Sequence, residues 1–210
     1  MKTTLKITAI AFMLCFTVQL FAQHEKEIKN SEVEGLYLTF SDFQNGKLTR
    51  PTDKQHEGDK IKLKQFFISP DIISIEQDKE TVFQKDSIFA IHITNGENYR
   101  FINRNSCLIA DTSSLYIYAY KTTKTVYNTS GAHRRSKEVP ITYYYFSLTG
   151  NKAVYTLTLA NVRKYALADP ATHIAVCNKF TTDEMLTKVN QQTGRFELNE
   201  TILSQIQKKE

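Results

Sequence analysis

The chain has only three cysteines among 210 residues, and no two of them form a Cys-x-x-Cys pair. The sequence therefore lacks the spacing that is typical of thiol-redox motifs and structural zinc sites. It also lacks a glycine-rich phosphate loop, a Gly-x-Ser-x-Gly nucleophile motif, repeats at solenoid periods and low-complexity tracts. From these absences we predict no metal site and no cofactor.

One long apolar run is present, at the N-terminus. Two lysines precede an apolar stretch over residues 7–21, and Ala22 ends it before a polar segment. A basic start, a short apolar core and a small residue before a polar switch are typical of a secretory signal peptide. The run is shorter than the roughly 20 residues that span hydrocarbon. We therefore predict a signal peptide over 1–22, a mobile leader over 23–32, and a periplasmic or secreted protein without a transmembrane segment after processing.

The charge balance is mildly basic. The formal net charge of +5 falls to +3 when the two lysines of residues 1–22 are removed. Nucleic-acid binders usually carry a concentrated basic stripe, so we predict no nucleic-acid partner. The remaining length is that of one domain, predicted over residues 33–206 with a helical part over 159–206.

Two cysteines, Cys107 and Cys177, lie outside the signal peptide. In an oxidising compartment they could form a disulfide that closes a long loop and contributes about 4 kcal/mol. The alternative is two buried free thiols. We favour it because a domain of this size does not need a cross-link.

The middle of the chain alternates apolar and polar residues with a period of two, which is typical of strands. Asn95-Gly96 between two alternating runs is a strong hairpin signal. Residues 122–139 are predicted to be a polar loop. The paired runs are 88–93 with 99–102, 107–110 with 115–120, and 141–148 with 153–157.

The last quarter changes to helical spacing. Asp169-Pro170 is a favourable helix start, and the second helix is predicted to bury Ile174, Cys177 and Phe180. Thr181 and Glu184 have the spacing of a capping box. The predicted fold class is α+β: an antiparallel meander or half-barrel of about 6–9 strands, followed by three or four short helices.

The tyrosines suggest a binding surface. Tyr116, Tyr118 and Tyr120 recur at period two, so they line one face of a strand, opposite the aliphatic residues between them. If the aliphatic face is the core, the rings face outward and can bind a saccharide, peptide or protein. The alternative is that the C-terminal helices cover the tyrosine row as a second packed layer.

Two further groups of residues are candidates for chemistry. His92, Asp111 and His173 could assemble a hydrolytic site in space, although their spacing is not that of a motif. The basic cluster over 133–137 could hold acidic glycans or lipid headgroups. The simpler interpretation is that these histidines serve no common site and that the basic cluster is a solvated loop tip.

The segment Gly35–Gly46 resembles the opening of a group of uncharacterised exported proteins of Bacteroidota-type bacteria, whose pattern is Gly-x-Tyr-x-Thr-x-x-Asp-Phe-x-x-Gly-like. Tyr144–Ser147, Tyr155–Thr158 and the Phe-Ala-Gln ending of the signal peptide are also similar to theirs. The resemblance implies a periplasmic or surface location and carries no activity.

The functional hypothesis is a non-enzymatic envelope protein that binds an envelope glycan, a peptide or a protein. An envelope hydrolase that uses the dispersed histidines is the first alternative. An effector or its neutralising partner in competition between bacteria is the second.

Overall fold

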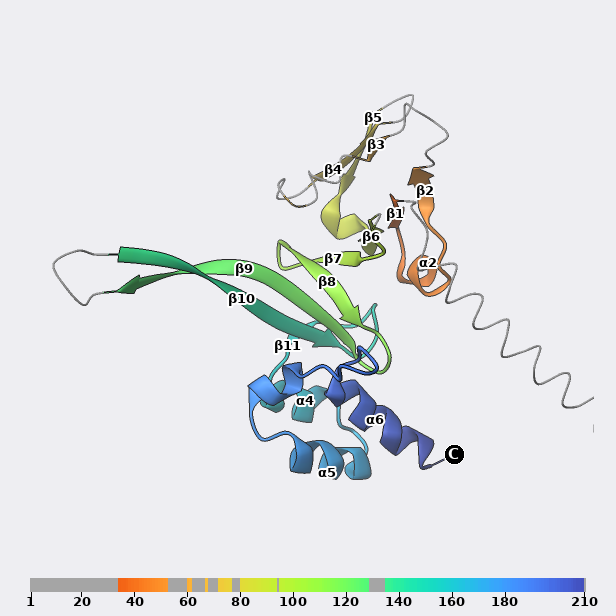
Figure 1. Cartoon of the computed structure of the whole chain (residues 1–210). Helices are drawn as coiled ribbons and strands as arrows, with labels where there is room; N and C mark the ends of the chain where they lie inside the picture. The colour runs from red at the N-terminus through yellow and green to blue at the C-terminus, as the bar shows by residue number, and fades with distance from the viewer. Residues whose placement is uncertain are drawn as a thin grey trace, which may run out of the picture.

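A computed structural model describes residues 34–52, 60–61, 67, 72–76, 80–93, 95–128 and 135–209. Within these ranges the strands form an eight-stranded antiparallel sheet, in the order β11-β10-β9-β8-β7-β6-β1-β2, and a three-stranded sheet, β3-β4-β5. The C-terminal helices follow (Figure 1). The predicted α+β half-barrel with C-terminal helices is confirmed. The predicted signal peptide and leader, residues 1–32, lie outside the described residues.

The bounds of the elements are as follows. The strands are β1 (Glu34–Tyr37), β2 (Thr49–Thr52), β3 (Lys60–Ile61), β4 (Ile72–Glu76), β5 (Glu80–Gln84), β6 (Ala90–His92), β7 (Asn98–Ile102), β8 (Asn105–Asp111), β9 (Tyr116–Asn128), β10 (Arg135–Ser147) and β11 (Tyr155–Thr156). The helices are α2 (Phe40–Gln44), η1 (Lys85–Ser87), α4 (Leu159–Tyr165), α5 (Pro170–Lys179), η2 (Asp183–Thr187) and α6 (Glu197–Gln207).

The predicted hairpins are present. β6 pairs with β7, β8 with β9, and β10 with β11, each antiparallel. Gly96 supplies a φ of 84° at the first turn, a backbone conformation that glycine adopts without strain. The turn between β7 and β8 has positive φ at both Asn103 and Arg104, as a two-residue turn of the type that matches strand twist requires.

The predicted loop over 122–139 is wrong, because most of it continues β9 and β10. The two strands pair from Tyr116↔Ser147 out to Asn128↔Arg135 and form a ribbon that extends beyond the rest of the sheet (Figure 1). Polarity suggested a loop, yet β-branched threonines favour strands, and a ribbon with two solvated faces needs no apolar alternation. Residues 133–134 of the basic cluster lie outside the described residues.

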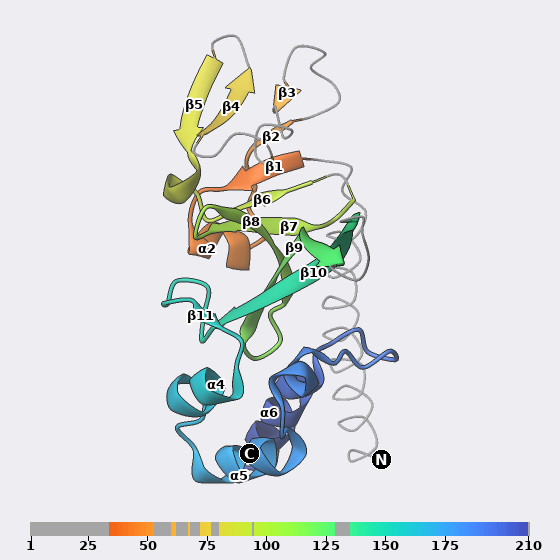
Figure 2. The ribbon, with the colours of Figure 1, turned by 90° about the vertical axis from the view of Figure 1, so that its left-hand side faces the viewer.

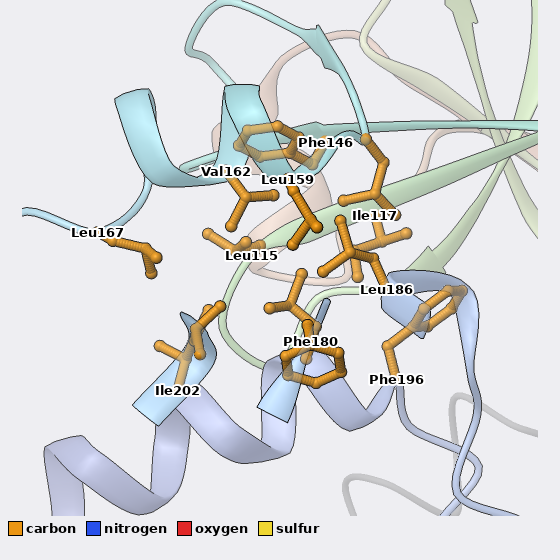
Figure 3. Close-up of a cluster of buried hydrophobic side chains, with 13 residues drawn as sticks. Leu115, Ile117, Phe146, Leu159, Val162, Leu167, Phe180, Leu186, Phe196 and Ile202 are labelled. Carbon is orange, nitrogen blue, oxygen red and sulfur yellow. The ribbon is translucent and has the colours of Figure 1, made fainter. Parts of the chain in front are cut away.

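The C-terminal helices lie at the β10–β11 end of the sheet, below these strands in Figure 2. They form a core with the aliphatic face of β9, which includes Ile117, and with Phe146 of β10 (Figure 3). Within α5 the predicted buried residue Ile174 is 61% exposed, and Val176 takes the core position instead. Phe180 is buried as predicted. The C-terminal helices, together with Leu167 between α4 and α5 and Phe180 directly after α5, contribute these residues to the core: Leu159, Val162, Leu167, Val176, Phe180, Leu186, Leu198 and Ile202.

The predicted capping box before η2 is also wrong. The N-cap of η2 is Thr182, which makes no side-chain capping bond, and the hydroxyl of Thr181 donates to the sulfur of Met185. The short helix is held by its buried Leu186 rather than by its cap.

Two buried polar side chains join the last helix to the sheet. Asn199 of α6 accepts a hydrogen bond from the backbone N–H of Leu115 at 3.0 Å and donates one to its carbonyl at 2.9 Å. Asp111 accepts from the backbone N–H of Phe196 at 2.9 Å and from that of Ser113 at 2.8 Å. These bonds fix where α6 begins relative to the turn between β8 and β9.

Candidate functional site

On the opposite face of the sheet, which carries the tyrosine row, α2 packs beside Tyr116. The helix begins at a capping box: the hydroxyl of Thr39 accepts from the N–H of Asp42 at 3.1 Å, and the Asp42 carboxylate accepts from the N–H of Thr39 at 3.0 Å. Gly46, with a φ of 63°, lets the chain reverse after the single turn. Sequence reasoning missed this helix, although Thr39-x-x-Asp42 was a usable signal.

Aromatic rings hold α2 against the sheet. Phe43 lies 5.2 Å from both Tyr37 and Phe89 between ring centroids, and Phe40 lies 5.5 Å from Tyr116. Such edge-on and tilted pairs contribute about 0.5–1.5 kcal/mol each beyond area burial. Gly150, in the turn after β10, lies so close to Phe40 that a Cβ there would stand 2.2 Å from its ring.

A pocket of about 440 Å³ opens beside this ring cluster. Its size is within the range of small-molecule sites. The lining residues that the structure describes contribute three aromatic rings and several neutral polar groups, and none of them carries a charge. The lining residues are Tyr37, Phe43, Gln44, Gly46, Asn98, Thr112 and Tyr116.

The polar groups of the pocket are available to a ligand. Among the described residues, no protein group hydrogen-bonds the Tyr37 and Tyr116 hydroxyls or the Gln44 side chain. Burial raises the pKa of both tyrosines, so their hydroxyls stay protonated and can donate. Thr112, an exposed residue, adds a further hydroxyl to the lining.

His92 positions one wall of the pocket. It is buried, and its Nδ1 lies 2.9 Å from Oδ1 of Asn98, the residue opposite it in the β6–β7 pair. Because an amide oxygen can only accept a hydrogen bond, Nδ1 of His92 is the donor. The NH₂ group of Asn98 is then left for a ligand. The Tyr37 ring stands edge-on to His92 at 6.4 Å.

The structure divides the predicted tyrosine row into three environments. Tyr116 lines the pocket. Tyr118 is fully buried, with its hydroxyl 2.8 Å from Nη1 of Arg100 and 3.0 Å from Oγ of Ser147. Tyr120 stacks on Tyr143 at 6.3 Å where the β9–β10 ribbon leaves the body.

Both expectations for the row therefore need correction. The row is not open throughout, because Tyr118 has no exposed surface. The C-terminal helices do not cover it either, since they pack on the aliphatic face of the same strand. The side chains that pack around Tyr118 belong to the sheet itself and to Val154 in the turn before β11.

The candidate hydrolytic residues have separate partners. His92 is paired with Asn98, both carboxylate oxygens of Asp111 accept backbone N–H groups, and His173 lies in α5. No hydrogen bond or ion pair joins any two of the three within the described ranges. In those ranges no three His, Cys, Asp or Glu side chains lie close enough to hold a metal ion.

The two cysteines are free, as the favoured alternative predicted, but only Cys107 is buried, so the predicted burial of Cys177 is wrong. Cys107 is buried on the tyrosine side of the sheet, in the cluster around Tyr118, and burial raises the pKa of its thiol to about 12. Cys177 is half-buried in α5, on the helical side, so His173 and Cys177 are remote from the pocket residues.

No family model, no curated protein and no solved structure matches this chain. The resemblance to exported Bacteroidota-type proteins therefore stays a prediction. In the part of the chain that the structure describes, no helix is long and apolar enough to cross a membrane.

Most of the pocket residues were not predicted. Of the seven, only Tyr116 was a candidate. Gln44 ends α2, Asn98 begins β7 and Thr112 follows β8. Their sequence positions share no spacing, so only the paired register of β6 to β9 and the docking of α2 bring them together.

Proposed function

We propose that this chain is an exported, non-enzymatic binding protein, and that the pocket beside α2 binds a unit of a neutral saccharide. One observation carries the proposal: the described lining residues of the pocket combine aromatic rings with unengaged hydroxyl and amide groups, and none of them is charged. A sugar ring has the complementary surface, because it offers apolar C–H faces to rings and many hydroxyls to neutral hydrogen-bonding groups.

The neutral character of the described lining residues favours one class of ligand. A carboxylated, phosphorylated or sulfated ligand would lose hydration on entering the pocket and would find no cation among the lining residues. A purely apolar ligand would leave the Tyr116 hydroxyl and the Asn98 amide without partners, at a cost of about 1–3 kcal/mol for each buried group. A neutral, polyhydroxylated ligand avoids both penalties.

The proposal can be tested with defined probes. Neutral oligosaccharides of glucose, xylose, mannose and N-acetylglucosamine are screened by thermal shift, and any that stabilise the protein are titrated by calorimetry. We expect at least one of them to bind. Failure of every neutral sugar, with binding of an acidic one, would contradict the proposal.

Variants then locate the site. Gln44→Ala removes an exposed amide, and Tyr116→Phe removes a hydroxyl but keeps the ring against Phe40. Each should weaken binding about tenfold, as expected for one lost hydrogen bond to a ligand, without altering the melting temperature. Gln192→Ala, an exposed glutamine in another part of the chain, is the matched control and should bind as the parent does.

A further inference from the structure

The β9–β10 ribbon has an open edge along β9. β8 pairs with β9 only as far as Leu108↔Ala119, although β8 itself begins earlier, at Asn105. Beyond Ala119, no strand in the described part of the chain lies against this edge (Figure 1). Lys121 and residues 123–127 are exposed. An open strand edge presents backbone donors and acceptors to solvent.

The β9–β10 register shows which residues of β9 direct their backbone N–H and C=O groups toward the open edge. In an antiparallel pair, two opposite residues either bond each other or both face away. The carbonyl of Tyr144 accepts from Leu157, so Tyr144 faces away from β9. Every second residue of β10, counted from Tyr144, also directs its backbone groups away from β9, and Pro140 is one of these residues. The residue opposite Pro140 in the register is Thr123. Thr123 therefore points its N–H and C=O away from β10, at the open edge.

The same alternation applies to Lys121 and Thr125, which face Thr142 and Glu138 in the register. Three residues of β9 thus offer a donor and an acceptor each along about 13 Å of edge. The outer edge of β10 differs, because Pro140 has no N–H to offer there. The ribbon is therefore blocked along one edge and continuous along the other.

The charge of the ribbon selects the partner. Its described residues beyond Ala119 include four cations and one anion, Glu138. Two copies of β9 would bring these like charges together, which disfavours self-pairing. A strand that carries carboxylates gains from the same charges, and Val126, 48% exposed, offers it an apolar contact beside Lys124. The four cations are Lys121, Lys124, Arg135 and Lys137.

From this register and charge we propose that the outer edge of β9, over residues 121–125, binds an extended acidic peptide segment of a partner protein as an added strand. This mode of recognition derives affinity from backbone hydrogen bonds and selectivity from alternate side chains. The site is separate from the saccharide pocket, so either proposal can fail while the other stands.

The probe is a labelled, end-blocked heptapeptide of alternating Glu and Val, titrated into the purified protein by fluorescence anisotropy. We expect saturable binding. N-methylation of single probe amides then tests the hydrogen-bonding pattern: methyl groups on alternate residues should weaken binding about tenfold or more, and those on the residues between should be tolerated. Loss that is equal at all positions, or absent at all positions, overturns strand addition.

Two protein variants separate a directed contact from general attraction. Lys124→Glu reverses a charge on β9 and Lys137→Glu reverses one on β10, a strand farther from the edge. Both change the net charge equally. Lys124→Glu should lower the affinity for the acidic probe about tenfold, and Lys137→Glu should lower it less than about threefold. Equal losses would indicate nonspecific attraction and overturn the proposal.

Thr123→Pro removes one outward N–H without removing a bond to β10, and it should abolish probe binding while the melting temperature stays close to that of the parent. Sedimentation velocity provides the last control. A dimer that Thr123→Pro dissociates would show that the edge serves a second copy of the chain, and it would overturn the acidic-peptide proposal.

Discussion

Replacement of Asn199 should destabilise the protein far more than its single side chain suggests. Asn199 is fully buried and satisfies both the N–H and the C=O of Leu115, which is itself buried. Asn199→Ala leaves both backbone groups without partners at the junction of α6 and the sheet. An unsatisfied buried group costs about 1–3 kcal/mol, so we expect a loss of about 4 kcal/mol in the free energy of unfolding. In a domain of this size that lowers Tm by about 8–16 °C.

Asn161 provides the matched control. Its side-chain amide also donates to a carbonyl, that of Thr156 at 2.9 Å, but this bond is exposed and water can replace it. Asn161→Ala should therefore cost about 0.5 kcal/mol. Urea denaturation followed by circular dichroism measures both variants. A loss below about 1 kcal/mol for Asn199→Ala would refute the claim that this side chain fastens the helices to the sheet.

Asn199→Asp tests the same contact through the direction in which stability changes with pH. A carboxylate at this position can still accept from the Leu115 N–H, but it repels the Leu115 carbonyl, to which only a protonated carboxyl can donate. The native state of this variant therefore favours the proton. The difference in the free energy of unfolding between this variant and the parent should be smallest near pH 4 and should grow as the pH rises toward about 8. A constant difference across that range would contradict the geometry.

Three shorter predictions concern other parts of the chain. The Lys209 ammonium holds the pKa of Asp169 well below its ordinary value of 3.8. The ionised Asp169 therefore stabilises the protein above pH 3.8, and this stabilisation is lost as the pH falls through the pKa of Asp169 in the folded state. Asp169→Asn should flatten the decline of Tm at acidic pH, measured by calorimetry. Iodoacetamide should modify Cys177 in the folded protein but Cys107 only after denaturation, by peptide mapping, and early labelling of Cys107 would contradict its burial. The mature protein should begin at Gln23 by N-terminal sequencing, and an unprocessed N-terminus would contradict the predicted export.

The sequence predicted the fold where local signals were strong. Asn95-Gly96 marked the β6–β7 hairpin, and Asp169-Pro170 marked the start of α5, because both depend on the conformations of adjacent residues. The β9–β10 ribbon was missed because its polar faces lack the apolar alternation that a half-buried strand shows. Ile174 was assigned to the core because α5 has little amphipathic contrast along its length.

The pocket was predictable only in part. Period-two spacing placed Tyr116, Tyr118 and Tyr120 on one face, and the structure agrees. Their different exposure depends on what covers that face, namely α2 and the turn after β10, and these contacts join residues far apart in the sequence. No single-sequence pattern reports such contacts.

The central claim is that the pocket beside α2 binds a neutral saccharide. Hydrogen–deuterium exchange with the tightest neutral oligosaccharide tests it most directly, because it reports where on the chain the ligand binds. The account predicts slower exchange at residues 43–46 and 112–116, with no change along 121–127 of β9. Protection along β9, or no protection near α2 at saturating sugar, would contradict it.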